Sequence, residues 1–213
     1  MAEERLVLWG ESNFASPYVF SCFVALREKR LDFELRTLTL ASGEHRQGDY
    51  LARSLTGRVP ALQHGDLWLA ESSAIDEYLE EAFPPPAFPA LYPRRLGDRA
   101  RARQVQAWIR SDLMPLRAER PTSSVFGDAA VEPLSEAAQA AAASLVRVGE
   151  ALVSPGDDYL FGASFTIADA DLALMLQRLV ANDDPVPPRL KAYANRVWTR
   201  PSIEAWLSKA ASR

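Results

Sequence analysis

Two short stretches carry the polar residues whose types and spacing could do chemistry. Glu71-Ser72-Ser73 stands directly before an apolar run with helical spacing, and Ser16-Pro17 opens another. A helix start offers free N–H groups that attract a carboxylate, and a neighbouring glutamate attracts an ammonium group, so Glu71 and Ser72 could hold the end of an amino acid. Ser16 could donate a hydrogen bond to a thiolate and lower the pKa of that thiol from about 8.5.

Both stretches also have a purely structural interpretation. Serine is a preferred N-cap and proline a preferred first helical residue, which fits Ser16-Pro17. Ser73, with Asp76 three residues later, has the spacing of a capping box. From these residues alone, helix caps and ligand contacts both remain open.

A proline stands at the entrance of a predicted strand, in GRVPALQHGDLWLAE. The first strand residue need not donate to the ladder, so a trans Pro60 that merely starts the strand is the simplest interpretation. Only about 5–6% of X–Pro bonds are cis. If the Val59–Pro60 bond is cis, Val59 presents its N–H and C=O to an extended, peptide-like ligand.

Other reactive side chains are few. The chain has two histidines, His45 and His64, and one cysteine, Cys22. No serine or cysteine pattern completes a hydrolase triad, and this set is too small for a typical zinc site. With one cysteine and no C-x-x-C we expect no metal, no intramolecular disulfide and an inert Cys22 packed in a helix.

The elements that must position these residues follow from the hydrophobic pattern. The first 83 residues read as β-α-β, then an irregular helix, then β-β-α. The predicted elements are a strand at 6–9, a helix from Pro17, a strand at 33–40, a polar helix within 43–54, a hairpin across Gly65-Asp66, and a helix from Ser73.

A proline-rich stretch follows, with five of the fifteen prolines between 84 and 93. Neither helix nor sheet continues there, so we predict a linker at 85–93 between domains at 1–84 and 94–213. The second domain reads as all-helical, with Pro115 as a kink or stop in a long helix. Thr166 and Asp169 form a capping box before another helix.

Composition limits the partners. The 213 residues carry a net charge of −4 and a sequence pI near 5.3, which gives no support for a nucleic-acid or membrane partner. The first residues, MAEERLVLWG, lack a secretory signal, and no stretch approaches the ~20 apolar residues of a membrane helix. We therefore expect a cytoplasmic protein.

These pieces, in this order, resemble the cytosolic glutathione transferases over nearly the whole chain. The resemblance is carried by the SPYVF helix, R-VPAL, LAESSAI, the proline-rich linker and FTIADADLAL. The segment 99–122 is similar to the bacterial YfcF-type subgroup. The resemblance implies a thioredoxin-like α/β N-terminal domain, an all-α C-terminal domain and a homodimer.

The resemblance also implies site residues. Val59 looks like the residue before the cis-proline Pro60, pairing with the cysteinyl backbone of glutathione. Glu71 and Ser72 look like the contacts of the γ-glutamyl end, with Ser72 both cap and ligand. His45 stands where relatives place a polar contact to the tripeptide.

Ser16 resembles the serine that hydrogen-bonds the sulfur in serine-type classes, with Asn13 as a possible second donor. The electrophile would lie against Phe14 and the helix carrying Trp108 and Met114. Because residue 16 is not cysteine, it cannot form a mixed disulfide with glutathione, and the Ser-Ser-Cys pattern of the maleylacetoacetate isomerase class is absent.

The implied activity is a glutathione transferase with glutathione as co-substrate and no other cofactor. Its thiolate would attack a small hydrophobic electrophile, in detoxification or oxidative stress. Two alternatives remain open: a glutathione-dependent peroxidase acting on organic hydroperoxides, and a non-catalytic binding or scaffold protein.

Overall fold

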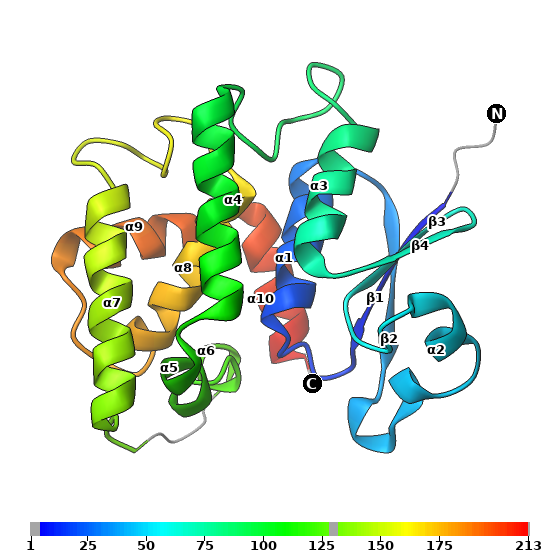
Figure 1. Cartoon of the computed structure of the whole chain (residues 1–213), viewed down its shortest axis with the longest axis horizontal. Helices are drawn as coiled ribbons and strands as arrows, with labels where there is room; N and C mark the ends of the chain where they lie inside the picture. The colour runs from blue at the N-terminus through cyan, green and yellow to red at the C-terminus, as the bar shows by residue number, and fades with distance from the viewer. Residues whose placement is uncertain (1–4, 128–131, 213) are drawn as a thin grey trace. The chain divides into compact units, whose positions relative to one another are not determined.

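The computed structural model describes residues 5–127 and 132–212 (Figure 1). Within them the chain forms two compact units. One comprises residues up to 91 together with 208–212, and the other comprises 92–207. The domain limits expected from the sequence, 84 and 94, stay predictions.

The first unit is built on a four-stranded sheet with the order β2-β1-β3-β4. β1 and β2 are parallel, because the helix between them returns the chain to the end of the sheet at which β1 begins; β3 is antiparallel to both β1 and β4. The elements are β1 (Leu6–Glu11), α1 (Pro17–Glu28), β2 (Phe33–Leu38), the 3-10 turns at Leu40–Ser42 and Glu44–Arg46, α2 (Gly48–Ser54), β3 (Ala61–His64), β4 (Leu67–Ala70) and α3 (Ser72–Ala82).

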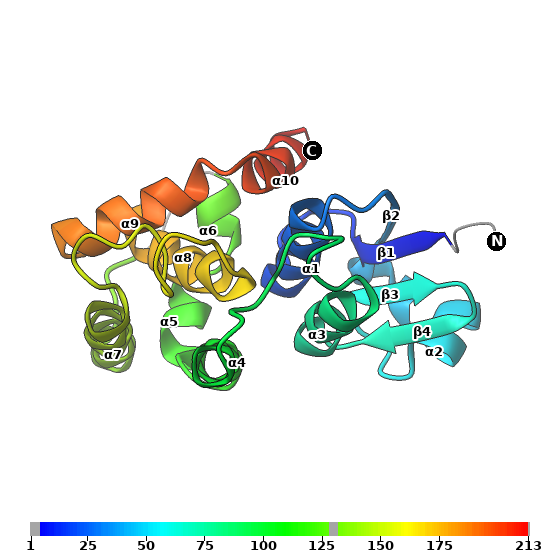
Figure 2. The ribbon, with the colours of Figure 1, turned by 90° about the horizontal axis from the view of Figure 1, so that it is seen from above.

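Helices cover both faces of this sheet. Figures 1 and 2 show α1 and α3 side by side on one face and α2 on the other. This is the thioredoxin-like arrangement predicted from the sequence. Between the sheet and the α1–α3 layer lie fully buried side chains, each of which contributes roughly 1.5–3 kcal/mol on burial. They include Leu8, Phe20, Leu26, Leu62, Ile75 and Leu79.

The contact between β1 and α1 depends on a glycine. A Cβ built on Gly10 would lie 2.7 Å from Cγ1 of Val19, which is closer than atoms of this kind approach. Val19 is itself 1% exposed and, being β-branched, has little freedom to move away. Gly10 therefore lets the start of α1 approach the end of β1, where the candidate site forms.

Aromatic side chains cover part of the α2 face. Trp9, Tyr50 and Trp68 have ring centroids 5.5 to 6.1 Å apart, and the guanidinium of Arg36 stands 5.3 Å from the Trp9 ring. The Tyr50 hydroxyl donates to the main-chain oxygen of Arg58 at 2.6 Å. α2 is thereby tied to the segment that leads into β3.

A buried ion pair fixes the far end of α1 and α3. Lys29 Nζ lies 2.6 Å from Glu80 Oε2 and donates to the main-chain oxygen of Phe83 at 2.7 Å. The same carboxylate oxygen accepts the N–H of Leu91 at 2.9 Å. Burying two charged groups costs desolvation free energy, and the ion pair with its hydrogen bonds offsets that cost.

The second unit is helical, as predicted. Its helices are α4 (Leu96–Ser111), α5 (Met114–Glu119), α6 (Ser123–Phe126), α7 (Glu136–Leu152), α8 (Ile167–Val180), α9 (Pro188–Trp198) and α10 (Pro201–Ala211). The last four residues of α10, 208–211, are counted with the first unit. α8 is the central helix, since its residues from Ile167 to Leu179 are all buried.

The capping box predicted at the start of α8 is present. Asp169 Oδ2 accepts the Thr166 N–H at 2.8 Å and the Thr166 hydroxyl at 2.7 Å. The other carboxylate oxygen accepts the Leu160 N–H at 2.7 Å and the Tyr193 hydroxyl at 2.9 Å. Burial raises the pKa of Asp169, and these hydrogen bonds oppose that shift.

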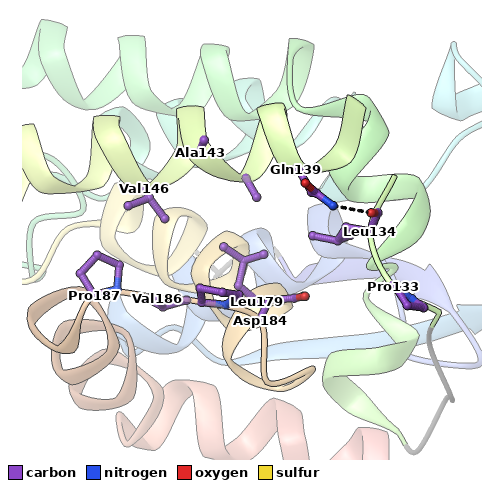
Figure 3. A pocket seen from close by; sticks show the side chains of 11 residues that line it. Pro133, Leu134, Gln139, Ala143, Val146, Leu179, Asp184, Val186 and Pro187 are labelled. Atoms are coloured by element: carbon purple, nitrogen blue, oxygen red, sulfur yellow. Dashed lines mark hydrogen bonds between the residues drawn. The ribbon is translucent and has the colours of Figure 1, made fainter. Parts of the chain in front are cut away.

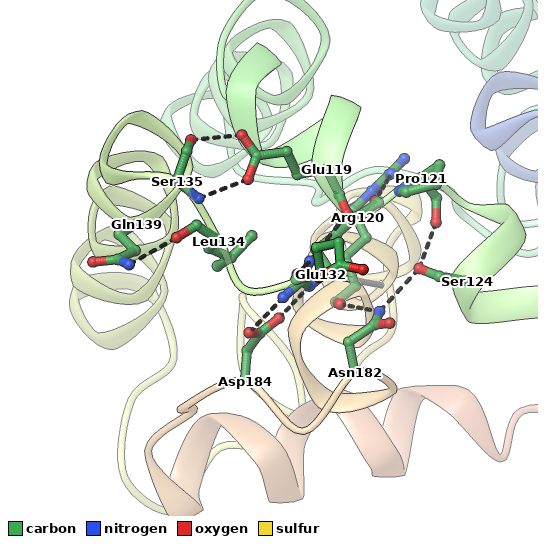
Figure 4. Close-up of polar contacts among 11 residues, drawn as sticks. Glu119, Arg120, Pro121, Ser124, Glu132, Leu134, Ser135, Gln139, Asn182 and Asp184 are labelled. Atoms are coloured by element: carbon green, nitrogen blue, oxygen red, sulfur yellow. Dashed lines mark hydrogen bonds and ion pairs between the residues drawn. The ribbon is translucent and has the colours of Figure 1, made fainter. Parts of the chain in front are cut away.

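A polar network joins the ends of α5, α7 and α8 (Figure 4). Arg120 makes two hydrogen bonds to the carboxylate of Asp184, at 2.6 and 3.0 Å, and one to the main-chain oxygen of Glu132 at 2.9 Å. Glu119 accepts both the N–H and the hydroxyl of Ser135, the N-cap of α7, and these bonds lower the pKa of Glu119.

Candidate functional site

A cavity of about 390 Å³ opens at the amino end of α1, within the first unit. It brings together four residues singled out in the sequence: Asn13, Ser16, His45 and Val59. Pro60, Phe14, Glu71 and Ser72 are not among the residues that line it. The lining residues are Glu11, Asn13, Ala15, Ser16, Pro17, Tyr18, Leu40, His45, Arg58 and Val59.

Ser16 is the N-cap of α1. Its Oγ accepts the N–H groups of Tyr18 and Val19, at 3.3 and 3.2 Å, and Pro17 occupies the first helical position. Its own N–H donates to a carboxylate oxygen of Glu11. In both side-chain bonds the oxygen is the acceptor, so the hydroxyl retains its hydrogen for an acceptor in the cavity.

Val59 stands two residues before the start of β3 and is joined to Pro60 by a cis peptide bond. The ladder between β1 and β3 reaches Trp9 and Ala61 and no further. Among the residues that the structure describes, no hydrogen bond uses the N–H or C=O of Val59. This main chain can therefore pair with an extended ligand.

The segment before Val59 is fixed from the α2 side by Tyr50. Burial raises the pKa of Tyr50 well above its ordinary value, so the phenol stays protonated and continues to donate to the carbonyl of Arg58. The Arg58 side chain is exposed and lines the cavity. No ion pair of this guanidinium is present in the described part of the chain.

Glu71 and Ser72 stand at the start of α3. Ser72 is the first helical residue and is 4% exposed, and the N-cap position belongs to Glu71 rather than to Ser72. The predicted capping box of Ser73 and Asp76 is wrong. The Asp76 carboxylate instead accepts the hydroxyl of Ser21 in α1, at 3.0 Å.

Glu71 has an unusual backbone. Its φ is 69° and its ψ is 116°, a conformation that L-residues other than glycine rarely adopt. Its side chain makes no capping hydrogen bond and is exposed. Such strain costs about 1–3 kcal/mol and persists where function favours the side chain.

His45 belongs to the 3-10 turn at Glu44–Arg46 and is half-buried. Its Nδ1 is covered and has no hydrogen-bond partner among the described residues. His45 nevertheless lines the cavity.

The residues expected to hold the electrophile are less well placed by the structure. Phe14 has a φ of 49° in the loop before α1. Trp108 donates its indole N–H to Asp112 at 3.0 Å, and Met114, at the start of α5, is 57% exposed. Trp108 and Met114 belong to the second unit, and their part in an electrophile site stays a prediction.

Sequence reasoning missed Glu11, Tyr18 and Arg58. Tyr18 and Arg58 are neighbours of predicted residues, so their adjacency was the available signal. Glu11 ends β1 and is 3% exposed, but this burial follows from the fold, and the sequence carried no signal for it.

A larger cavity, of about 790 Å³, lies within the second unit (Figure 3). Its two polar side chains are already engaged: Gln139 donates to the main-chain oxygen of Leu134 at 2.8 Å, and Asp184 is held by Arg120. Among the described residues that line it, none is a serine, threonine, cysteine, lysine or histidine. The rest of its lining is apolar: Pro133, Leu134, Ala142, Ala143, Val146, Leu179, Pro185, Val186 and Pro187.

Two further observations concern the part of the chain that the structure covers. No group of three or more His, Cys, Asp or Glu side chains is arranged to hold a metal ion there. Nor does any helix within 5–127 and 132–212 combine the length and apolar character that crossing a membrane requires.

Comparison with known sequences matches both halves of the chain. Residues 15–82 match the N-terminal domain of glutathione S-transferase, and residues 95–212 match its C-terminal domain. Glutathione S-transferase 3 of Zea mays is 31% identical over 205 residues, which cover 93% of this chain and 86% of that protein. Maleylacetoacetate isomerase of Pseudomonas aeruginosa is 47% identical over 97 residues, 44% of each protein.

Solved structures agree. A crystal structure of a glutathione transferase homolog from Burkholderia, with bound glutathione, superposes with a TM-score of 0.81. That protein is 42% identical to this chain, and the match covers 98% of this chain and 99% of the other.

Proposed function

The chain belongs to the glutathione S-transferase family, and on that premise we propose that it binds glutathione in the cavity beside α1 and ionises its thiol there. One observation carries the proposal. The hydroxyl of Ser16, with a hydrogen to donate, and the unpaired main chain of Val59 line the same cavity. A thiol-bearing peptide needs both groups.

The tripeptide would lie along the edge before β3. The cysteinyl N–H and C=O pair with the main chain of Val59, as when a strand adds to a sheet. At one end, the exposed guanidinium of Arg58, with His45 nearby, suits the glycyl carboxylate.

At the other end, the γ-glutamyl group carries an ammonium and a carboxylate. The exposed carboxylate of Glu71 suits the ammonium, and the first N–H groups of α3, beginning at Ser72, suit the carboxylate. The strained backbone of Glu71 supports this assignment, because it turns an acid outward at a position where glycine would cost less.

Ser16 would then stabilise the thiolate. Lowering the pKa of a thiol by about two units requires about 2.7 kcal/mol. A hydrogen bond to a charged group contributes about 1.5–3 kcal/mol, and a helix amino terminus about 0.3–1 kcal/mol. Ser16 at the start of α1 supplies both effects.

The reaction follows from the thiolate. The thiol proton leaves to solvent, the sulfur electron pair forms a bond to an electrophilic carbon, and a leaving group departs with its own pair. No general base is required once the thiol is ionised. The electrophile, the homodimer and the cytoplasmic location implied by the resemblance belong to the same proposal.

Titration of bound glutathione by thiolate absorbance tests the mechanism. We expect a thiol pKa about two units below that of free glutathione, and an upward shift of most of that amount in Ser16→Ala. Ser111→Ala is the matched control, since its hydroxyl bonds only main-chain oxygens within α4. An unshifted pKa, or full activity of Ser16→Ala, would remove Ser16 from the mechanism.

A second candidate activity is isomerisation of maleylacetoacetate, which the 47% identity to the Pseudomonas aeruginosa isomerase favours over part of the chain. A substrate panel distinguishes the candidates. It contains an activated aryl halide, an organic hydroperoxide and maleylacetoacetate, each with glutathione. Turnover of the hydroperoxide would oxidise two glutathione molecules to their disulfide and release an alcohol and water.

A further inference from the structure

We propose that Glu11 is a positioning residue for Ser16: its carboxylate holds the N–H of Ser16 so that the serine hydroxyl faces the glutathione thiol. This inference deepens the function proposed above and rests on it. The juxtaposition of a buried acid, a helix cap and a cavity carries it.

Glu11 is well placed for this role. It is the last residue of β1, pairs in register with Leu38 of β2 and is 3% exposed. It lines the same cavity as Ser16. Its main-chain oxygen accepts the N–H of Phe14 at 3.3 Å, and its carboxylate accepts the N–H of Ser16. Both ends of the loop between β1 and α1 are therefore tied to this one residue.

The bond to Ser16 completes a cap that the helix cannot complete itself. In a capping box, an acidic or amide side chain at the third helical position reaches back to the N–H of the N-cap residue. α8 shows this form, with Asp169 accepting the N–H of Thr166 at 2.8 Å. In α1 the third position is Val19, which has no acceptor, and Glu11 takes that role from the preceding strand.

The consequence for Ser16 is a fixed orientation. Its oxygen accepts the N–H groups of Tyr18 and Val19, and its own N–H is held by Glu11. Without an acceptor at position 11, the N–H of Ser16 would lose its partner at a half-buried position. The serine backbone would then turn toward water and carry the hydroxyl away from the sulfur.

The acceptor, and not the negative charge, is the useful property of Glu11. A carboxylate near a thiolate disfavours the thiolate, so the charge itself works against ionisation. Glutamine keeps a carbonyl oxygen at the same reach without the charge. Glu11→Gln and Glu11→Ala therefore separate the two properties.

The experiment measures the thiol pKa of bound glutathione in five full-length proteins. They are the wild type, Ser16→Ala, Glu11→Ala, Glu11→Gln and the Glu11→Ala/Ser16→Ala double variant. We expect Glu11→Ala to raise the pKa by about one to two units, as Ser16→Ala does. At a pH below the pKa, each unit of this rise lowers the fraction of bound glutathione present as thiolate about ten-fold. Glu11→Gln should leave the pKa no higher than in the wild type. In the double variant the pKa should be no higher than in Ser16→Ala alone, because Glu11 acts through the serine.

Three results would overturn the proposal: an unchanged pKa in Glu11→Ala, an equal further rise when Ser16 is already alanine, or a Glu11→Gln pKa as high as that of Glu11→Ala. Circular dichroism and thermal unfolding establish that each variant is folded. Should Glu11→Ala not fold, Glu11→Leu replaces it as the variant that lacks the acceptor. If the thiol pKa of glutathione bound to the wild type is unshifted, the proposed function itself fails. If that pKa is lowered in the wild type and equally lowered in Glu11→Ala, only the role of Glu11 is removed.

Discussion

The residues of the cavity divide into those that offer side chains and those that offer main chain. Ser16 contributes a hydroxyl, and Val59 contributes an unpaired N–H and C=O. The basic residues among those that line this cavity are Arg58 and His45, and Arg58 carries the guanidinium. Different parts of the tripeptide would therefore depend on different residues, and substitutions should affect separate kinetic constants.

Arg58→Ala should raise the KM for glutathione about ten-fold, the loss of one charge-assisted hydrogen bond, and leave the thiol pKa of the bound peptide unchanged. Steady-state kinetics at two ionic strengths provide the measurement, with Arg101→Ala on the exposed side of α4 as the control. Glutathione with an amidated glycyl carboxylate should bind both proteins equally. A larger KM for that analogue in Arg58→Ala would assign the arginine elsewhere.

Glu71→Gly should separate stability from binding. Glycine adopts a φ of 69° without strain, so we expect the free energy of unfolding to rise by about 1 kcal/mol or stay level. Affinity for glutathione should fall, because the acid facing the ammonium is gone. Urea unfolding and calorimetry measure the two quantities, and Glu71→Gln, which retains the strain, is the matched comparison.

The helices and strands position these residues through local and long-range contacts, and sequence spacing predicts the local contacts better than the long-range ones. The β-α-β-α-β-β-α order and the capping box at Thr166 were predictable, because apolar periodicity and local spacing determine them. The start of α3 was not, because the partner of Asp76 is Ser21, fifty-five residues away. The helix expected within 43–54 is divided by Gly43 and Gly48, whose φ values of 78° and 53° interrupt it.

The site residues could likewise be predicted where local sequence patterns mark them and not where a contact through space places them. Asn13, Ser16, His45 and Val59 came together because the loops that carry them follow recognisable strands and helix starts. Glu11 was missed because an acid at a strand end gives no sign of its bond to an N–H five residues on. Pro115 was expected to kink or stop a long helix. The helix does stop there, since α4 ends at Ser111, and Pro115 lies in the first turn of the next helix, α5. A proline favours that position as much as it forbids the interior.

The contact between β1 and α1 gives a prediction at the scale of elements. Gly10→Ala should destabilise the fold by about 1–3 kcal/mol, because the added methyl group meets Val19 at 2.7 Å. Adding Val19→Ala should recover part of that loss, since it removes the opposing methyl groups. Denaturant unfolding of the two single variants and the double variant measures the coupling, and purely additive losses would contradict the packing described here.

Asp169 gives a second prediction, on α8. Asp169→Ala removes the acceptor for four hydrogen bonds and should cost about 3–5 kcal/mol, against about 1 kcal/mol for Tyr193→Phe, which removes one of them. Thermal and denaturant unfolding provide the comparison. Equal losses in the two variants would show that the other bonds contribute nothing.

The same carboxylate predicts a pH dependence. Burial raises the pKa of Asp169 in the folded protein, so its contribution to stability is complete below the unfolded pKa of about 4 and declines as pH rises through the folded value. The stability advantage of the wild type over Asp169→Asn should therefore be larger at acidic than at neutral pH. A stability advantage over Asp169→Asn that grows with rising pH would show that the pKa of Asp169 is lowered rather than raised.

At the scale of the whole molecule, the chain divides its tasks between two compact units. The cavity with the polar groups is built entirely by the first unit, and the larger apolar cavity entirely by the second. Family membership accounts for both units, since each matches its own domain of the same family. The helical spacing of the residues in the second unit indicates which side chains are packed inside it. It does not indicate which side chains contact a substrate, so substrate choice could not be predicted from the sequence.

Tyr50 has a consequence that reaches beyond its own helix. Its helix, α2, lies on the opposite face of the sheet to α1. The Tyr50 hydroxyl donates to the carbonyl of Arg58, the residue before Val59. Substitutions in α2 can therefore change how firmly the peptide edge is held without altering any residue that lines the cavity.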